Sequence, residues 1–195
     1  MKMISLIAPS SAGKDAILKK LIERKYVQPI ISDTSRCIRN GELRGREYNF
    51  LTDKEIKQKI NNNEYIEKRE YKVQNGDIWI YGINKNSFDI NSDITYGVII
   101  DYNGLKQMEE YLYSLGERDN LISIYIDVPL QERLSRSLQR EGQLTDEQCL
   151  EICRRALDDD IHVKIAKDYC DYVVNNEGNI ENTINRILNI MEENI

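Results

Sequence analysis

Residues 1–18 read MKMISLIAPSSAGKDAIL, and the rest of the chain is organised around them. The segment from Ile4 to Ile7 is short and mostly apolar, as a buried strand is. A loop of small residues follows, then Gly13-Lys14 and a helical pattern of apolar residues. This strand–loop–helix order is the setting that a phosphate-binding loop requires, and its template is G-x-x-x-x-G-K-[ST]. Small residues let backbone N–H groups turn toward a phosphate, and the start of the helix adds the positive end of its dipole.

The loop departs from that template at two positions, because it reads A-P-S-S-A-G-K-D from Ala8 to Asp15. Ala8 replaces the first Gly and is nearly as small. Asp15 replaces the Ser or Thr whose hydroxyl binds Mg²⁺ beside the phosphates. We expect Lys14 to reach the outer phosphates of a nucleotide. The alternative is a tight strand-to-helix turn that carries an exposed lysine.

The composition is that of a soluble protein with a packed core. The chain has 195 residues, of which 41% are hydrophobic and 31% are charged, and this suits a single domain. The net charge is -6 and the pI is about 5.0, so we expect no nucleic-acid partner, since non-specific binding needs a basic surface. No apolar run approaches the roughly 18 residues that span a membrane, so we expect no membrane partner.

The cysteines indicate neither a metal site nor a disulfide framework. Cys37, Cys149, Cys153 and Cys170 show no C-x-x-C spacing, and His162 is the only histidine, which argues against zinc. Cys149 and Cys153 lie one helical turn apart, and we expect both to pack in the interior. We expect reduced thiols and a cytoplasmic protein.

Apolar periodicity divides the chain into alternating strands and helices. Strands are predicted at residues 4–7, 27–32, 97–101, 121–128 and 172–174, and helices at residues 15–26, 105–115, 130–140, 146–167 and 180–191. This alternation predicts an α/β fold, with a parallel sheet flanked by helices on both faces. Residues 33–88 break the alternation and predict an inserted strand-rich lobe. Within it we expect a helix at residues 53–62, capped by Thr52, and a hairpin turn at Asn75-Gly76.

A second informative stretch is residues 32–50, SDTSRCIRNGELRGREYNF. Arg36 and Arg39 are three residues apart, and arginine forks bind phosphate oxygens through two hydrogen bonds. Tyr48 can add a hydroxyl donor. On spacing alone, a solvated basic loop is the better interpretation of this cluster.

The same stretch resembles the nucleotide-monophosphate-binding segment of guanylate kinases, S-x-T-T-R-x-x-R-x-G-E-x-x-G-x-x-Y-x-F. The resemblance continues along the chain. It covers residues 63–67 (NEYIE), the Tyr81-Gly82 turn, residues 101–104 (DYNG) and residues 173–176 (VVNN). The chain is therefore similar to the guanylate kinase family, which implies a P-loop NTPase-type parallel sheet flanked by helices. It also implies one guanylate-kinase-like domain over residues 1–195. Its parts would be a core (1–32, 95–130 and 155–195), a nucleotide-monophosphate-binding lobe (33–90) and a helical lid (131–154).

The resemblance implies a GMP site. Its residues would be Ser32, Arg36, Arg39, Tyr48, Glu67, Tyr81 and Asp101. Glu67 would accept hydrogen bonds from the guanine N1–H and 2-amino groups. Adenine has an acceptor at N1 and no 2-amino group, so it would leave a buried carboxylate unpaired, at a cost of a few kcal/mol. The alternatives are a surface carboxylate for Glu67 and a helix cap for Asp101.

The resemblance also implies an ATP site and a set of catalytic cations. The ATP-binding residues would be Ser10, Ser11, Ala12, Gly13, Lys14, Asp15, Ala16 and Asn175. The catalytic residues would be Lys14, Arg39, Arg136, Arg140 and Arg155, of which the helical arginines would close over the transferred phosphate. For each helical arginine, a surface charge paired with Glu132, Asp158 or Asp159 is about equally expected.

The implied cofactor is Mg²⁺ with ATP, and the candidate metal residues are Asp15 and Asp101, because carboxylate oxygens bind this ion directly or through water. Three further positions depart from the family pattern. Ile38 replaces a Pro that is common in the family, and Ile83 replaces a Ser or Thr that lies near the base. Ile99 replaces a second acidic residue that often precedes Asp101.

The implied activity is phosphoryl transfer from ATP to GMP or dGMP, with the oligomeric state left open. Two alternatives remain. One is a phosphokinase of the same fold that acts on ribose 1,5-bisphosphate or another nucleotide, which the Gly-Lys-Asp sequence and Ile83 motivate. The other is a guanylate-kinase-like binding module without turnover, against which Lys14, Arg36 and Arg39 argue.

Overall fold

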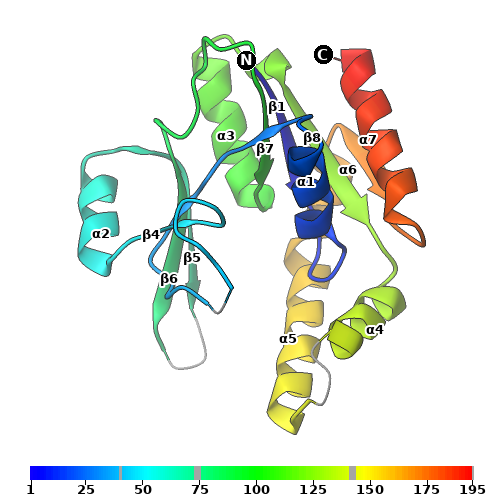
Figure 1. The fold of residues 1–195 in the computed structure, drawn as a ribbon. Helices are drawn as coiled ribbons and strands as arrows, with labels where there is room; N and C mark the ends of the chain where they lie inside the picture. Colours follow the sequence, from blue (N-terminus) through cyan, green and yellow to red (C-terminus); the bar gives the residue numbers. More distant parts are fainter. Residues whose placement is uncertain (40, 73–75, 141–143, 195) are drawn as a thin grey trace.

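The computed structural model describes residues 1–39, 41–72, 76–140 and 144–194, without the side chains of Arg140 and His162 (Figure 1). Its main sheet has the strand order β2-β7-β1-β8-β9, and every pair of neighbours is parallel. The strands are β1 (Lys2–Ile7), β2 (Gln28–Pro29), β7 (Thr95–Ile99), β8 (Leu121–Asp127) and β9 (Tyr172–Asn175). The predicted α/β class with a parallel sheet is confirmed.

Helices cover both faces of this sheet, as Figure 1 shows. One face carries α1 (Lys14–Glu23) and α7 (Ile180–Asn194), and the other carries α3 (Tyr102–Ser114) and α6 (Ile165–Tyr169). The alternation along β1 explains the two cores: Ile4 and Leu6 pack under α1 and α7, whereas Met3 and Ile7 pack under α3. A strand buried on both faces needs apolar residues at every position, which is why residues 3–7 are almost all apolar.

The inserted lobe is a second, mixed sheet in the order β4-β3-β6-β5. Its elements are β3 (Asp33–Thr34), β4 (Asn49–Phe50), β5 (Tyr65–Lys72), β6 (Ile78–Asn84) and α2 (Asp53–Asn61). Thr52 caps α2 in a reciprocal capping box with Glu55, as the sequence predicted. The β5 and β6 strands pair antiparallel as a hairpin, and Asn75 of its predicted turn lies outside the described residues.

Two further helices, α4 (Leu130–Arg140) and α5 (Asp146–His162), extend below the main sheet, and a short 3₁₀ turn, η1 (Arg118–Asn120), precedes β8. The predicted single helix over residues 146–167 is wrong, because α5 ends at His162 and α6 begins at Ile165. The backbone N–H groups of Val163 and Lys164 both reach the Asp159 carbonyl, while the Val163 side chain packs on the α3 core. The chain turns between the two helices at Val163, which is partly buried there.

Two smaller predictions also need correction. The strand expected at residues 27–32 is shorter, since β2 covers only Gln28–Pro29, and beyond it the Ile30 N–H still donates to the Gly97 carbonyl of β7. Cys153 is exposed and Cys149 half-buried on α5, so the expected interior packing of this pair is wrong for Cys153. In the described part of the chain, no helix is long and apolar enough to cross a membrane.

Candidate active site

The loop between β1 and α1 has the backbone geometry of a phosphate cradle. Gly13 caps α1 with a left-handed φ of 94°, and Ser11 also has a positive φ of 61°. A Cβ at Gly13 would lie 2.6 Å from Asn176 Nδ2, so both the backbone angle and the close approach require glycine here. The N-terminus of α1 is thereby left open to an anion.

Asn176 is the residue that braces this loop. Its Nδ2 donates to the Ala12 carbonyl at 2.8 Å, and its Oδ1 accepts from Thr183 Oγ1 at 2.7 Å. The residue predicted from the sequence was its neighbour Asn175, whose side chain is exposed and donates instead to Glu177. Strand alternation could have identified Asn176, because it lies two residues after the buried Val174 and so shares its face.

Lys14 lies at the mouth of the loop, with its side chain 24% exposed and its Nζ 3.6 Å from Asp15 Oδ2. Asp15 and Ala16 are exposed on the first turn of α1. One loop amide already meets an anion, because the Ser10 N–H donates to Asp159 Oδ2 of α5 at 2.7 Å. The loop therefore binds a carboxylate oxygen in this conformation, as an oxyanion site can.

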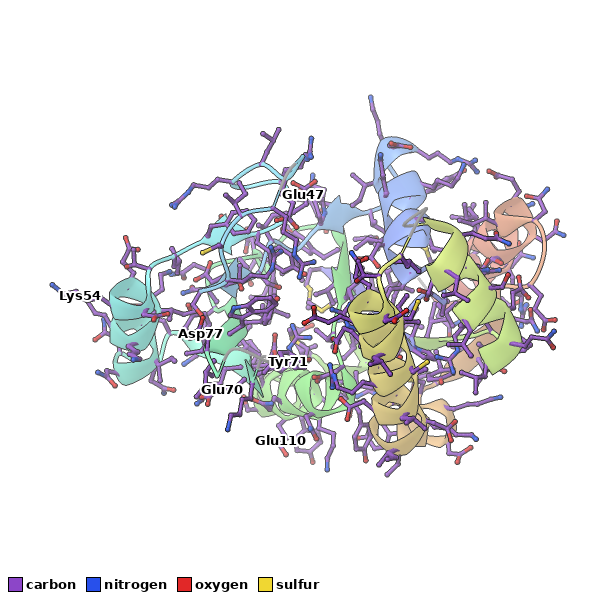
Figure 2. The ribbon with its side chains drawn as sticks, turned by 90° about the horizontal axis from the view of Figure 1, so that it is seen from below. Glu47, Lys54, Glu70, Tyr71, Asp77 and Glu110 are labelled. Atoms are coloured by element: carbon purple, nitrogen blue, oxygen red, sulfur yellow. The ribbon has the colours of Figure 1, made fainter. Side chains whose placement is uncertain are left out.

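Two cavities meet at the loop. The larger, of about 820 Å³, lies between the loop, α3 and β5, and the smaller, of about 270 Å³, lies between the loop, α4 and α5. Ser10, Lys14 and Asp159 line both of them. Figure 2 shows Tyr71 of β5 close to α3, between the second sheet and α5, and Tyr71 and Glu110 of α3 both line the larger cavity. A ligand in each cavity would place its reacting end at Lys14.

Cations from four segments converge on the smaller cavity. Its lining includes Lys14, Arg39, Arg133 and Arg155. Arg133 was missed by the sequence analysis although it is buried, with its Nε donating to the Val128 carbonyl and its Nη1 3.7 Å from Asp159. It lies one turn before Ser137, on the face of α4 that packs on the loop, a contact between residues far apart in the sequence.

The other predicted helical arginines are placed differently. Arg136 lies against the loop brace, where its Nη2 donates to the Asn176 carbonyl at 2.7 Å and to Glu132 at 2.5 Å. Arg155 is half-exposed and donates to Glu151 at 2.8 Å while it borders the cavity. The side chain of Arg140 lies outside the described residues.

Arg36 is the centre of a buried cluster in the second sheet. Glu42 accepts two hydrogen bonds of 2.9 Å from its guanidinium, and Arg36 Nε donates to the Tyr81 hydroxyl at 3.1 Å. Tyr48 stacks edge-on to Tyr81 and lies under the Arg36 guanidinium, at 5.4 Å. The hydrogen bonds from Arg36 lower the pKa of Glu42, so this pair stays charged and the arginine is held in one orientation. Ser32 is buried at the edge of the same sheet.

Glu67 is a buried carboxylate behind the larger cavity, and 1% of it is exposed. Arg69, two residues on, places its Nε 3.0 Å from Glu67 Oε2. Burial is the main cause that raises the pKa of Glu67, and the nearby Asp101 raises it further, whereas Arg69 opposes both. The predicted alternative of a surface carboxylate is therefore wrong.

Asp101 caps α3. Its Oδ1 accepts the Gly104 N–H and its Oδ2 accepts the Tyr71 hydroxyl, each at 2.8 Å. The helix-cap alternative for Asp101 is confirmed, and its metal role stays a prediction. Asp15 fits a metal ligand, because its carboxylate is 82% exposed beside Lys14, and Mg²⁺ in nucleotide sites takes one or two carboxylates plus phosphate oxygens. Over the described residues, no three His, Cys, Asp or Glu side chains form a metal cluster.

The parallel sheet, the glycine-capped loop and the converging cations define an α/β protein of the P-loop phosphotransferase class. The guanylate kinase family profile matches residues 1–194. The guanylate kinase of Mesomycoplasma hyopneumoniae (strain J) is 30% identical, with all of this chain and 95% of that protein aligned. That of Blochmanniella floridana is also 30% identical, over 89% of this chain and 78% of that protein. The crystal structure of guanylate kinase from Anaplasma phagocytophilum superposes with a TM-score of 0.69 at 26% identity, over 100% of this chain and 86% of that one. This chain belongs to the guanylate kinase family.

Proposed function

We propose that this protein transfers the γ-phosphate of ATP to GMP or dGMP, giving ADP and GDP or dGDP. The observation that carries the proposal is the buried Glu67 carboxylate, which is paired with Arg69 on the wall of a cavity that Lys14 of the phosphate loop also lines. A carboxylate there accepts from guanine N1–H and the 2-amino group and is left unpaired by adenine. The family membership supports the same reaction.

In this proposal the larger cavity holds the acceptor nucleotide. Its base lies toward Glu67 and its phosphate toward Arg36, Arg39, Tyr48 and Tyr81. The donor triphosphate lies on the loop from Ser10 to Ala16, where an ATP phosphate oxygen takes the place of the Asp159 carboxylate on the Ser10 amide. Asn175 and Asn176 would lie beside the adenine base of the bound ATP.

The transfer needs no general base, because the attacking oxygen of the acceptor phosphate is already anionic at neutral pH. That oxygen forms a bond to the γ-phosphorus while the bond to the β,γ-bridging oxygen breaks, and ADP leaves with the electron pair. Catalysis is then positioning and charge stabilisation. Lys14, Arg39, Arg133 and Arg155 are the cations that surround the reacting phosphates.

Mg²⁺ bound with ATP would neutralise charge on the β- and γ-phosphate oxygens, and Asp15 is the residue proposed to hold it, directly or through water. The helices α4 and α5, near the lid predicted at residues 131–154, would close over the transferred group and exclude water. Arg140, at the end of α4, is proposed as a further cation that binds the transferred phosphate. We also propose that the protein works in the cytoplasm on free nucleotides.

An acceptor panel tests the proposal. ADP release is followed in a coupled assay with GMP, dGMP, AMP, UMP and ribose 1,5-bisphosphate, each with Mg-ATP. GMP and dGMP are expected to be the best acceptors. Turnover with AMP but not with GMP would overturn the role of Glu67. Measurable GMP binding without turnover of any acceptor would favour a binding module.

A further inference from the structure

We propose that Arg69 is a base-recognition residue: it donates a hydrogen bond to the guanine O6 atom while Glu67 accepts from N1–H and the 2-amino group. The inference deepens the proposed function and rests on it. Arg69 is not among the site residues predicted from the sequence. Its charge is opposite to that of Glu67.

Arg69 and Glu67 form a close pair on one face of β5. Arg69 Nε lies 3.0 Å from Glu67 Oε2, and Arg69 Nη2 donates to Glu67 Oε1 at 3.2 Å. The side chains are 12% and 0% exposed. Two atoms of this pair, Glu67 Oε2 and Arg69 Nε, are buried without a well-oriented hydrogen bond within the described residues. The two atoms lie within ion-pair distance of each other, so their charges are paired although neither makes a well-oriented hydrogen bond.

The pair is directed at the larger cavity. Arg69 lines the cavity together with Tyr71 and Asp101, and Glu67 lies directly behind Arg69. Gly104 leaves the necessary room, because a Cβ there would lie 3.2 Å from Glu67 Oε2 and 3.3 Å from Asp101 Oδ1. Arg69 is therefore the cation that faces two carboxylates, and its charge offsets part of theirs when a neutral base is bound.

The chemistry of the pair matches one purine edge. Guanine presents an acceptor at O6 and donors at N1 and the 2-amino group, and arginine is the residue that most often contacts O6 in base recognition. A carboxylate and a guanidinium side by side provide the complementary order of acceptor and donor. Adenine presents a donor at position 6 and an acceptor at N1, so like groups would meet at both residues. Ile83 of β6 is paired with Glu67 of β5. It is apolar and fully buried, so its side chain supplies no hydrogen-bond donor to the base.

The test changes one functional group of the base at a time. The specificity constant kcat/KM is measured for GMP, for 6-thio-GMP, which replaces O6 by the weaker acceptor sulfur, and for IMP, which lacks only the 2-amino group. Wild type should prefer GMP to 6-thio-GMP by roughly tenfold or more, as expected for a hydrogen bond to a charged donor. In Arg69→Met the GMP constant should fall roughly ten- to a hundredfold. Its preference for GMP over 6-thio-GMP should approach unity, with its preference for GMP over IMP retained.

The matched control is Arg24→Met, which removes a guanidinium paired with Glu181 at the C-terminal end of α1, the end opposite the phosphate loop, and should leave all three constants unchanged. A loss of the GMP-over-IMP preference in Arg69→Met, with the 6-thio-GMP preference intact, would show that Arg69 only positions Glu67 and would overturn the proposal. So would a wild-type enzyme that does not distinguish GMP from 6-thio-GMP, a result that needs no variant to fold. Absence of GMP turnover in wild type would instead refute the proposed function.

Discussion

Asn176→Ala should destabilise the protein far more than Asn175→Ala, although the two residues are neighbours. Asn176 joins three parts of the chain: its side chain donates to Ala12 in the loop and accepts from Thr183 in α7. It is 3% exposed, so water cannot replace the contacts that alanine would remove. The Asn175 side chain is exposed and reaches only Glu177 within the described residues.

The magnitude follows from these contacts. Two hydrogen bonds are lost, at about 1 kcal/mol each, and the fully buried Ala12 carbonyl is left without its partner, which adds about 1 kcal/mol or more. The free energy of unfolding should therefore fall by about 2–4 kcal/mol. For a chain of this size that corresponds to a fall in Tm of roughly 5–15 °C. For Asn175→Ala the change should stay within about 0.5 kcal/mol, as for an ordinary surface substitution.

Urea unfolding followed by far-UV circular dichroism measures both changes directly. The KM for ATP should rise in Asn176→Ala, because the loop loses its brace, while the KM for GMP should change less. Equal stability of the two variants would refute this reasoning, as would an Asn176→Ala protein as stable as wild type.

Three further predictions concern charge and protonation. Lys14→Met should lower kcat about a hundred- to a thousandfold, the usual effect of removing one stabilising donor, with GMP affinity near wild type by calorimetry. Burial raises the pKa of the Cys170 thiol to about 12, so at pH 8 it should resist iodoacetamide while the exposed Cys37 reacts, as peptide mass spectrometry can show. The raised pKa of Glu67 means that its carboxylate form is lost as pH falls through a value above the usual carboxyl range. The kcat/KM for GMP should therefore fall on acidification, and in Arg69→Met this should begin at a higher pH, since Arg69 opposes the rise.

Each of these has a contrary outcome. A Lys14→Met enzyme with full kcat would exclude the lysine from the transfer step. Equal labelling of Cys170 and Cys37 at pH 8 would mean that the core around α6 opens readily. Identical pH profiles for GMP in wild type and Arg69→Met would show that Arg69 does not influence the ionisation of Glu67.

The sequence was most informative where local pattern and burial agree. The strand from Ile4 to Ile7, the small-residue loop and the Thr52 cap all depend on short-range geometry, and each is present in the structure. The break between α5 and α6 could not be predicted, because Val163 at this point packs against a core cluster most of whose residues lie far away in the sequence. Periodicity alone continues through this point.

In the candidate site, residue types were predicted better than contacts. Glu67 is buried and Asp101 borders the larger cavity, but the cap and the Tyr71 hydroxyl engage both oxygens of Asp101. Arg133 and Arg69 were missed because each is a single cation on a helix or strand, with nothing local to show which way it points. Their partners, Asp159 and Glu67, are identified only once the elements are packed together.

The most direct test of the account compares Glu67→Gln with wild type in the coupled ADP-release assay, with GMP and ATP varied separately. The amide keeps the size of the side chain but replaces one acceptor oxygen by a donor. We predict a large rise in KM or fall in kcat/KM for GMP, with the KM for ATP near its wild-type value. An equal loss for both nucleotides, or no loss for GMP, would contradict the assignment of Glu67 as the residue that selects guanine.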